Sequence, residues 1–217
     1  MTSPAELKRR AYLDALDIDV FVPRSEAPAE EPAVDFTALR AAVARCTRCA
    51  LHESRTQTVF GVGDPSADWM IIGEAPGAEE DRRGEPFVGR AGKLLDEMLR
   101  AVGLSRESVF IANVLKCRPP GNRDPSKAEA AACRSYLDQQ IAAIAPRLIL
   151  VVGRVAAQEL LGSDAPVGRL RGSRHDFNGI PLVVTYHPAY LLRSPVQKSK
   201  AWADLKLARR SAAERAA

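Results

Sequence analysis

The sequence has no apolar run that approaches the ~20 residues needed for a membrane-spanning helix. Its N-terminal stretch, MTSPAELKRRAYLDALD, also lacks the apolar core of a signal peptide. These two absences argue against membrane insertion and against secretion. We therefore expect a cytoplasmic protein with no membrane partner.

Cysteine is scarce, with four in the whole chain. Because the cytoplasm keeps thiols reduced, we do not expect these four to form structural disulfides. Cys46 and Cys49 form the C-x-x-C clip CTRC, whereas Cys117 and Cys133 come much later, with fifteen residues between them. Four thiolates of this kind suit a tetrahedral metal ion or an iron–sulfur cluster, and four unrelated buried thiols are the alternative.

Charge of one sign is not strongly in excess, since 31 Lys and Arg face 27 Asp and Glu, giving a net charge of +4. This mild basicity permits a nucleic-acid partner but does not demonstrate one. Apolar residues make up 46% of the 217 residues, which is typical of a globular protein. The length suits one α/β domain, which we expect to be monomeric.

Residues 1–35 differ in composition from the rest of the chain. The stretch RSEAPAEEPAVD mixes Pro, Ala and Glu with few apolar residues, as linkers do. We expect 1–35 to be a peripheral tail or linker, and a docking segment for a replication or repair protein is the alternative. Residues 36–212 then form a single domain, and 213–217 a C-terminal tail.

Four apolar runs each stop at a turn, at 69–73, 109–115, 147–153 and 180–188. Such near-continuous runs are typical of strands buried on both faces of a parallel sheet. Helical patterns alternate with them, at 92–103, 126–144, 153–162 and 198–210, and Ser126 and Glu129 have the spacing of a capping box. The alternation predicts an α/β fold, a three-layer α/β/α sandwich around a four-stranded, mainly parallel sheet.

The ends of the predicted strands hold groups capable of chemistry. Ligands of open parallel sheets bind beyond the carboxyl ends of the strands, and here those ends are followed by Gly73–Gly77, Asn113, Gly153 and His187. The turn GEAPG matches neither G-x-G-x-x-G nor a P-loop, so we do not expect nucleoside triphosphate binding. A tight turn without a ligand stays open as an alternative.

Further side chains near these ends complete a set of parts. The segment EPFVGRAG adds the aromatic Phe87, and GEAPG contains the carboxylate of Glu74. The set comprises an aromatic face, an amide, an imidazole, a carboxylate and backbone donors. These groups are what is needed to hold a planar heterocycle by its edge and to do chemistry beside it. Each also has a structural alternative: Phe87 in the core, Asn113 in a cap or turn, and His187 in a turn.

Four motifs resemble those of family 4 uracil-DNA glycosylases, the iron–sulfur members of that superfamily: GEAPGAEEDRRGEPFVGRAG, NVLKCRPPGNRDPSKAEAAAC, HPAYLLR and CTRC. The resemblance runs in order from about Phe36 to Arg210. It implies a uracil-DNA glycosylase-like fold and a base excision repair enzyme that flips uracil out of DNA and hydrolyses its N-glycosidic bond. Free uracil and an abasic site would be the products.

The resemblance implies a role for the cysteines as well. Cys46, Cys49, Cys117 and Cys133 match ligands of a [4Fe–4S] cluster with a structural rather than a redox duty. The spacing does not separate such a cluster from Cys₄ zinc, which stays the alternative.

The resemblance also implies which residues bind and act on the base. Phe87 would stack on the flipped uracil, and Asn113 would pair with its N3–H and O4. His187 would donate to O2 as negative charge builds there, and Glu74 would stabilise the positive charge on the sugar. The remaining substrate contacts come from the residues around the turn and after the last strand: Gly73, Ala75, Gly77, Arg193 and Ser194.

No lysine sits in these motifs as a Schiff-base nucleophile, so we expect a monofunctional glycosylase without strand cleavage. Some relatives trap uracil covalently through a histidine in an insertion, but no histidine lies between Asn113 and Cys133 here. Three alternatives stay open: a uracil-binding or uracil-crosslinking relative, a non-catalytic iron–sulfur DNA-binding module, and an electron-transfer or redox-sensing protein.

The charged loops are less specific. Glu80, in the acidic run after GEAPG, would either occupy the place of a thymine methyl group or be a solvated loop charge, and we favour the second. Two basic loops, RPPGNRDP and GRLRGSRH, are candidate DNA contacts through Arg118, Arg123, Arg169, Arg171 and Arg174.

Overall fold

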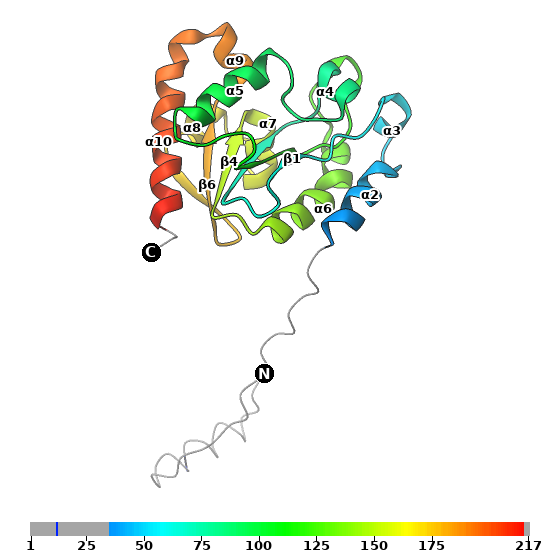
Figure 1. The fold of residues 1–217 in the computed structure, drawn as a ribbon, viewed down its shortest axis with the longest axis horizontal. Coiled ribbons are helices and arrows are strands. Elements are labelled where there is room, and N and C mark those ends of the chain that lie inside the picture. The colour runs from blue at the N-terminus through cyan, green and yellow to red at the C-terminus, as the bar shows by residue number, and fades with distance from the viewer. Residues whose placement is uncertain (1–11, 13–34, 215–217) are drawn as a thin grey trace. The chain divides into compact units, whose positions relative to one another are not determined.

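In the computed structural model, the described residues are Tyr12 and 35–214 (Figure 1). The predictions for residues 1–34 lie outside this range. Among the described residues, no helix has both the length and the apolar character to cross a membrane. The described residues from 35 onward belong to one compact unit.

The core is a six-stranded sheet, ordered β1-β3-β2-β4-β6-β5. Its four inner strands run parallel to one another and coincide with the four predicted apolar runs: β2 (Trp69–Gly73), β3 (Phe110–Asn113), β4 (Leu148–Val152) and β6 (Ile180–Thr185). The inner strands are almost wholly buried because helices cover both faces. The predicted fold class is therefore confirmed.

The predicted count of four strands is wrong, because two short antiparallel strands form the edges: β1 (Val62–Gly63) and β5 (Arg174–Phe177). Edge strands keep one side in solvent and so need no continuous apolar run. The hairpin that joins β5 to β6 turns at Asn178 and Gly179, both with positive φ, 51° and 80°. This Asn-Gly pair is the sequence signal that would have predicted β5.

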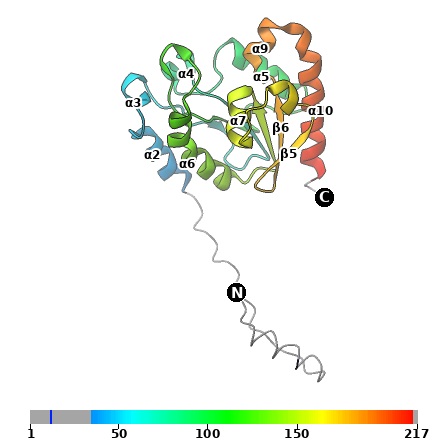
Figure 2. The same ribbon diagram turned by 180° about the vertical axis from the view of Figure 1, so that it is seen from behind.

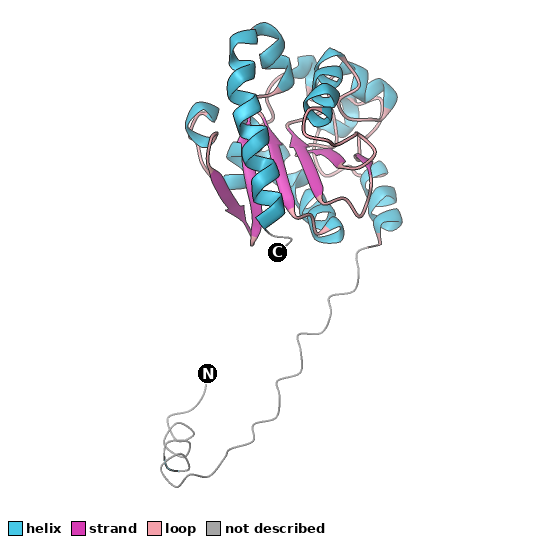
Figure 3. Cartoon of the chain, turned by 60° about the vertical axis from the view of Figure 1, so that its left-hand side comes forward, coloured by secondary structure: helices cyan, strands magenta, loops and turns pink. Residues whose placement is uncertain are grey.

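Helices form a layer on each side of the sheet (Figures 1 and 2). Alternate residues of β2 face opposite layers: Met70 and Ile72 belong to one apolar cluster, Trp69 and Ile71 to the other. The first layer comprises α2 (Phe36–Ala44), α6 (Lys127–Ile144), α7 (Arg154–Leu161) and α8 (Val167–Leu170), and the second α5 (Arg90–Arg100), α9 (Pro188–Arg193) and α10 (Lys198–Glu214). Figure 3 shows α10, which ends near the C-terminus, packed over one face of the sheet.

A local signal sets the start of α6 where the sequence predicts it. The Ser126 side chain accepts from the Glu129 N–H, and the Glu129 carboxylate accepts from the Ser126 N–H, so the predicted capping box opens α6. The remaining short elements are α3 (Leu51–Ser54), α4 (Ala78–Arg83) and two 3₁₀ turns, η1 (Pro120–Asn122) and η2 (Pro195–Gln197).

Parallel strand ends place the candidate residues together. Gly73 pairs with Asn113 in the register between β2 and β3, and Val152 pairs with Thr185 between β4 and β6. The segments that leave these strands begin at the same edge of the sheet, namely Glu74–Gly77, Gly153–Arg154 and Tyr186–His187. That edge is where a ligand site is expected.

Candidate active site

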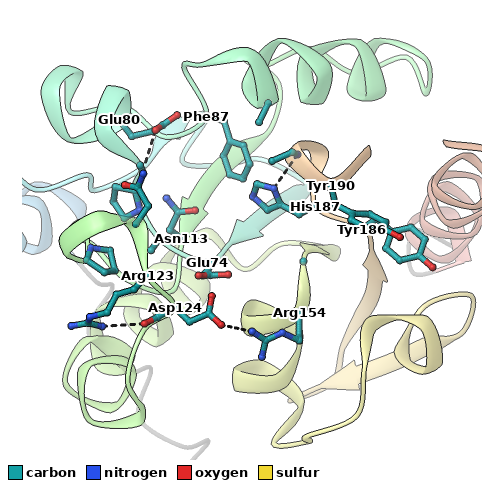
Figure 4. Close-up of a pocket in the computed structure, with 18 of the residues that line it drawn as sticks. Glu74, Glu80, Phe87, Asn113, Arg123, Asp124, Arg154, Tyr186, His187 and Tyr190 are labelled. Carbon is teal, nitrogen blue, oxygen red and sulfur yellow. Dashed lines mark hydrogen bonds and ion pairs between the residues drawn. The ribbon is translucent and has the colours of Figure 1, made fainter. Parts of the chain in front are cut away.

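A pocket of about 740 Å³ opens at the carboxyl edge of the inner strands (Figure 4). Seven of the predicted substrate and catalytic residues line it: Glu74, Ala75, Gly77, Phe87, Asn113, His187 and Arg193. They come from three regions that lie far apart in the sequence, at 74–87, 113 and 187–193. The predicted convergence is thus present in the structure.

Gly73 lies under the pocket and permits its two key side chains to approach each other. A Cβ atom at this position would stand 2.5 Å from Asn113 Oδ1 and 2.7 Å from Phe87 Cζ, and real Cβ atoms do not make such contacts. Asn113 is itself 2% exposed and fixed by the pairing of β3 with β2. Glycine at 73 is therefore required for the shape of the pocket.

Phe87 lies in a strained backbone conformation that aims its ring into the site. Its φ of 56° is in the left-handed region, which a bulky residue rarely adopts. The Arg106 guanidinium donates to the carbonyls of Pro86 and Phe87 and pairs with Asp96 at 3.2 Å, which stabilises this backbone. The Phe87 ring then lies against the His187 ring, with centroids 5.6 Å apart and planes 28° apart.

His187 is held as a neutral hydrogen-bond donor. It caps α9, and its Nδ1 accepts the Ala189 N–H at 3.1 Å, which leaves the ring proton on Nε2. Burial and the nearby Arg193 lower its pKa to about 4, although Glu80 opposes them. Gly153 leaves the space for this ring, since a Cβ there would stand 3.3 Å from two His187 carbon atoms.

The pKa of Glu74 is raised, whereas that of His187 is lowered. Burial and the Asp124 carboxylate raise its pKa to about 7, while Arg154 acts to lower it. Asp124 is itself ion-paired with Arg154, and all three side chains line the pocket (Figure 4). The sequence interpretation missed Asp124 and Arg154 as pocket residues, although Arg154 directly follows Gly153 at the end of a predicted strand.

Glu80 is partly buried and lines the pocket, so it is not a solvated loop charge. Its carboxylate accepts backbone N–H groups from Gly77 at 3.1 Å, Val88 at 3.0 Å and Gly89 at 3.4 Å. The favoured prediction for Glu80 is therefore wrong. Its neighbour Asp81 is buried and accepts the Thr56 N–H with both oxygens, at 3.0 and 3.1 Å. These carboxylates satisfy loop donors and hold the turn closed.

Three of the arginines suggested as DNA contacts pair with carboxylates: Arg123, Arg171 and Arg174, the last with exposed Glu214 at 2.8 Å. Arg171 donates to Asp204 at 2.9 and 2.7 Å, in an ion pair whose carboxylate is fully buried. Arg123 lines the pocket but makes a two-pronged pair with Glu129, at 2.8 and 2.7 Å, and this pairing lowers the pKa of Glu129 to about 2. The suggestion of DNA contact is not supported for Arg171.

The four cysteines are free thiols in one neighbourhood, at the α2–α3 connection, the end of β3 and the first half of α6. Burial raises the pKa of the Cys117 thiol, Arg55 opposes this, and nearby Cys49 and Cys46 add to it. Arg55 Nη1 donates to Cys117 Sγ at 3.1 Å, and the Lys116 N–H donates to Cys133 Sγ at 3.4 Å. Donors of this kind stabilise thiolate ligands, so the donor set fits a metal centre.

Within residues 35–214, no three or more His, Cys, Asp and Glu side chains are arranged so that they could hold a metal ion.

Comparison with known proteins was made against families and curated sequences. A family model described as the uracil DNA glycosylase superfamily matches residues 60–206. The chain is 43% identical over 169 residues to the type-4 uracil-DNA glycosylase of Archaeoglobus fulgidus, which covers 74% of this chain and 85% of that protein. Its identity to the type-4 enzyme of Pyrobaculum aerophilum is 42% over 180 residues, 79% of this chain and 92% of the relative. Its identity to the type-4 enzyme of Thermotoga maritima is 46% over 154 residues, which cover 70% of this chain and 80% of the relative.

Proposed function

The chain belongs to the uracil-DNA glycosylase superfamily, and we propose that it is a monofunctional DNA repair glycosylase that releases free uracil from DNA and leaves an abasic site. The observation that supports this most directly is the meeting of Phe87, Asn113, His187 and Glu74 in one pocket. The relatives are named for this activity, and the pocket holds the chemical groups it needs.

Base recognition falls to Phe87 and Asn113. A uracil flipped out of the DNA stack loses its neighbouring bases, and the Phe87 ring replaces one of them. The Asn113 amide donates to O4 of the base and accepts from N3–H. Cytosine presents an amino group and an unprotonated N3 at this edge, so the same amide would meet a mismatched pattern.

His187 and the backbone of the Glu74–Gly77 turn stabilise the departing base. As the glycosidic bond breaks, negative charge builds on O2, and the Nε2–H of neutral His187 donates to it. A neutral donor held in place before the reaction needs no reorganisation, and such a contact contributes ~3 kcal/mol. The ring is neutral above pH ~4, which covers the physiological range.

Glu74 faces the sugar, where positive charge develops. Its ionised carboxylate stabilises an oxocarbenium-like sugar and orients the attacking water. Because its pKa is raised to about 7, only part of the enzyme population is ionised at neutral pH. Arg193, the last residue of α9, and Ser194, directly after it, contact the DNA phosphates beside the flipped nucleotide.

The cysteines Cys46, Cys49, Cys117 and Cys133 hold a [4Fe–4S] cluster in this proposal. When bound, such a cluster links α2, α3, β3 and α6 covalently and takes no part in breaking the glycosidic bond. A single zinc ion needs sulfur atoms ~3.8 Å apart, from a Zn–S bond of ~2.3 Å. Cys₄ zinc stays the alternative, and the metal content of the purified protein separates the two.

We also propose that the enzyme is a cytoplasmic monomer that acts on uracil-containing DNA through a catalytic domain at residues 36–212. Residues 1–35 and 213–217 lie outside the catalytic unit.

The deciding experiment incubates the purified full-length chain with a uracil-containing oligonucleotide and measures free uracil by chromatography. We expect uracil release, strand cleavage only after alkali, and a loss of ~10²-fold or more in Asn113→Ala and His187→Ala, in line with the loss of one preorganised donor. Unchanged activity in both variants would remove the site assignment. An adduct stable in SDS would favour the crosslinking alternative.

The metal centre has its own measurement. Absorbance near 400 nm that disappears with loss of iron is the expected property of a cluster. Zinc in place of iron in the purified protein would overturn the assignment. Reversible reduction at a physiological potential would favour the electron-transfer alternative.

A further inference from the structure

Lys116 is a buried lysine that the chemistry above does not use. It is 1% exposed, in the core next to the pocket. Its ammonium donates to the Asn113 carbonyl at 2.7 Å and to Gln140 Oε1 at 2.6 Å. Gln140 is fully buried and donates in turn to the Phe60 carbonyl at 2.8 Å, so both ends of the contact are fixed.

The position of the contact matters for the site. Beyond Asn113, backbone hydrogen bonds continue between the segments that follow β3 and the end of β2. The Val114 N–H donates to the Gly73 carbonyl at 2.9 Å, and the Leu115 N–H donates to the Glu74 carbonyl at 3.0 Å. The Asn113 carbonyl belongs to the peptide plane between Asn113 and Val114. Holding that plane fixes the direction in which the Asn113 side chain leaves the backbone.

The backbone of Lys116 makes the link to the cysteines. Its N–H donates to Cys133 Sγ at 3.4 Å, its carbonyl accepts the Val59 N–H at 2.8 Å, and the next residue is Cys117. Two residues therefore separate the base-reading amide from a lysine that contacts the cysteine centre. This is the shortest connection between the two sites along the chain.

We propose that Lys116 is a positioning residue, which orients Asn113 toward uracil and couples that orientation to the cysteine centre. The inference rests on the proposed function. Packing alone does not account for the amine, because an apolar side chain of similar length fills such a space without the cost of burying a polar group. Two fixed acceptors at hydrogen-bond distance give the ammonium a specific task.

The test replaces Lys116 with methionine, which keeps the length and removes the donor. We expect kcat/KM for uracil release to fall by ~10-fold, the size of one buried hydrogen bond. This loss should vanish in the Asn113→Ala background, where there is no amide left to orient, and persist in the His187→Ala background. An equal loss in both backgrounds, or a loss below two-fold in the wild-type background, would overturn the proposal.

A second measurement does not depend on activity. Amide hydrogen exchange of residues 110–116 should accelerate in Lys116→Met, while exchange of β6 at Ile180–Thr185 stays unchanged. If that variant fails to fold, Gln140→Leu frees the ammonium on one side and should show the same pattern. Gln139→Leu is the matched control, since Gln139 is the exposed neighbour on the same helix.

The two proposals fail in different ways. A wild-type chain that releases no uracil refutes the proposed function, and the exchange measurement still tests the link from Lys116 to Asn113. Unchanged exchange at 110–116 in both Lys116→Met and Gln140→Leu refutes that link, whatever the activity.

Discussion

Replacing Asp124 with asparagine removes a negative charge that faces Glu74 while it keeps the size of the side chain. Two effects follow from the contacts. The repulsion that raises the Glu74 pKa is lost, and Arg154, released from its ion pair with Asp124, acts more strongly to lower that pKa. Both effects favour the ionised form of Glu74, so Asp124→Asn should be more active than the wild type in mild acid.

The size of the gain follows from the titration. With a pKa of about 7, roughly 10% of Glu74 is ionised at pH 6. Burial, the largest cause of the raised pKa, is unchanged by the substitution, so we take the removable part as about one pH unit. About half of Glu74 is then ionised at pH 6, which is a gain of ~5-fold, and the gain disappears above pH ~8.

The assay is the pH dependence of kcat/KM for uracil release from a single-stranded oligonucleotide, since kcat/KM reports the free enzyme. The matched control is Asp138→Asn, which breaks a partly buried ion pair between Asp138 and Arg134 on α6, away from the pocket, and should leave the profile unchanged. The reasoning is refuted if the acid limb of Asp124→Asn coincides with that of the wild type or moves to higher pH.

Three further outcomes are expected. Glu74→Gln should raise the melting temperature at pH 8 but not at pH 5. The Glu74 carboxyl, whose pKa is raised from 4.5 to about 7, favours folding below pH 4.5 and loses that contribution as the pH rises through about 7. The expected gain in the free energy of unfolding at pH 8 is ~1 kcal/mol after allowance for solvent screening, and equal gains at both pH values would contradict the prediction. Gly73→Ala should abolish uracil release by displacing Asn113 and Phe87, whereas Gly168→Ala, where a Cβ meets nothing within 4 Å, should retain it; the two are compared by single-turnover kinetics. Phe87→Ala should raise KM by ~10-fold or more through loss of stacking, and a change in kcat alone would argue against a stacking role.

The pocket could be placed from the sequence because the signals that define it are local. Apolar runs that end at a turn mark buried strands, and parallel strands end at one edge, so Asn113 and His187 had to lie near Gly73–Gly77. The edge strand β5 was missed because its residues, RHDF, alternate in exposure and lack an apolar run. The Asn178-Gly179 turn is the sequence signal that would have predicted this strand.

The electrostatic partners could not be placed in this way. Glu80, Asp124, Arg171 and Lys116 read as ordinary charged residues in loops or strand ends. In the structure, Glu80 accepts loop N–H groups and Asp124 pairs with Arg154 beside Glu74. Arg171 pairs with buried Asp204, and Lys116 donates to Asn113 and Gln140. Each pairing depends on distances of a few ångströms between segments that periodicity does not relate.

The sequence by itself determined the α/β sandwich, the edge at which the pocket opens and the residue types that line it, because strand burial, helix capping and turn chemistry act over a few neighbouring residues. The tertiary structure decided which groups are charged and which way they point: a neutral His187, a Glu74 that titrates near pH 7, and an Asn113 held from behind by a buried lysine. Charge and orientation depend on burial and on partners brought in from distant segments, and folding alone supplies both.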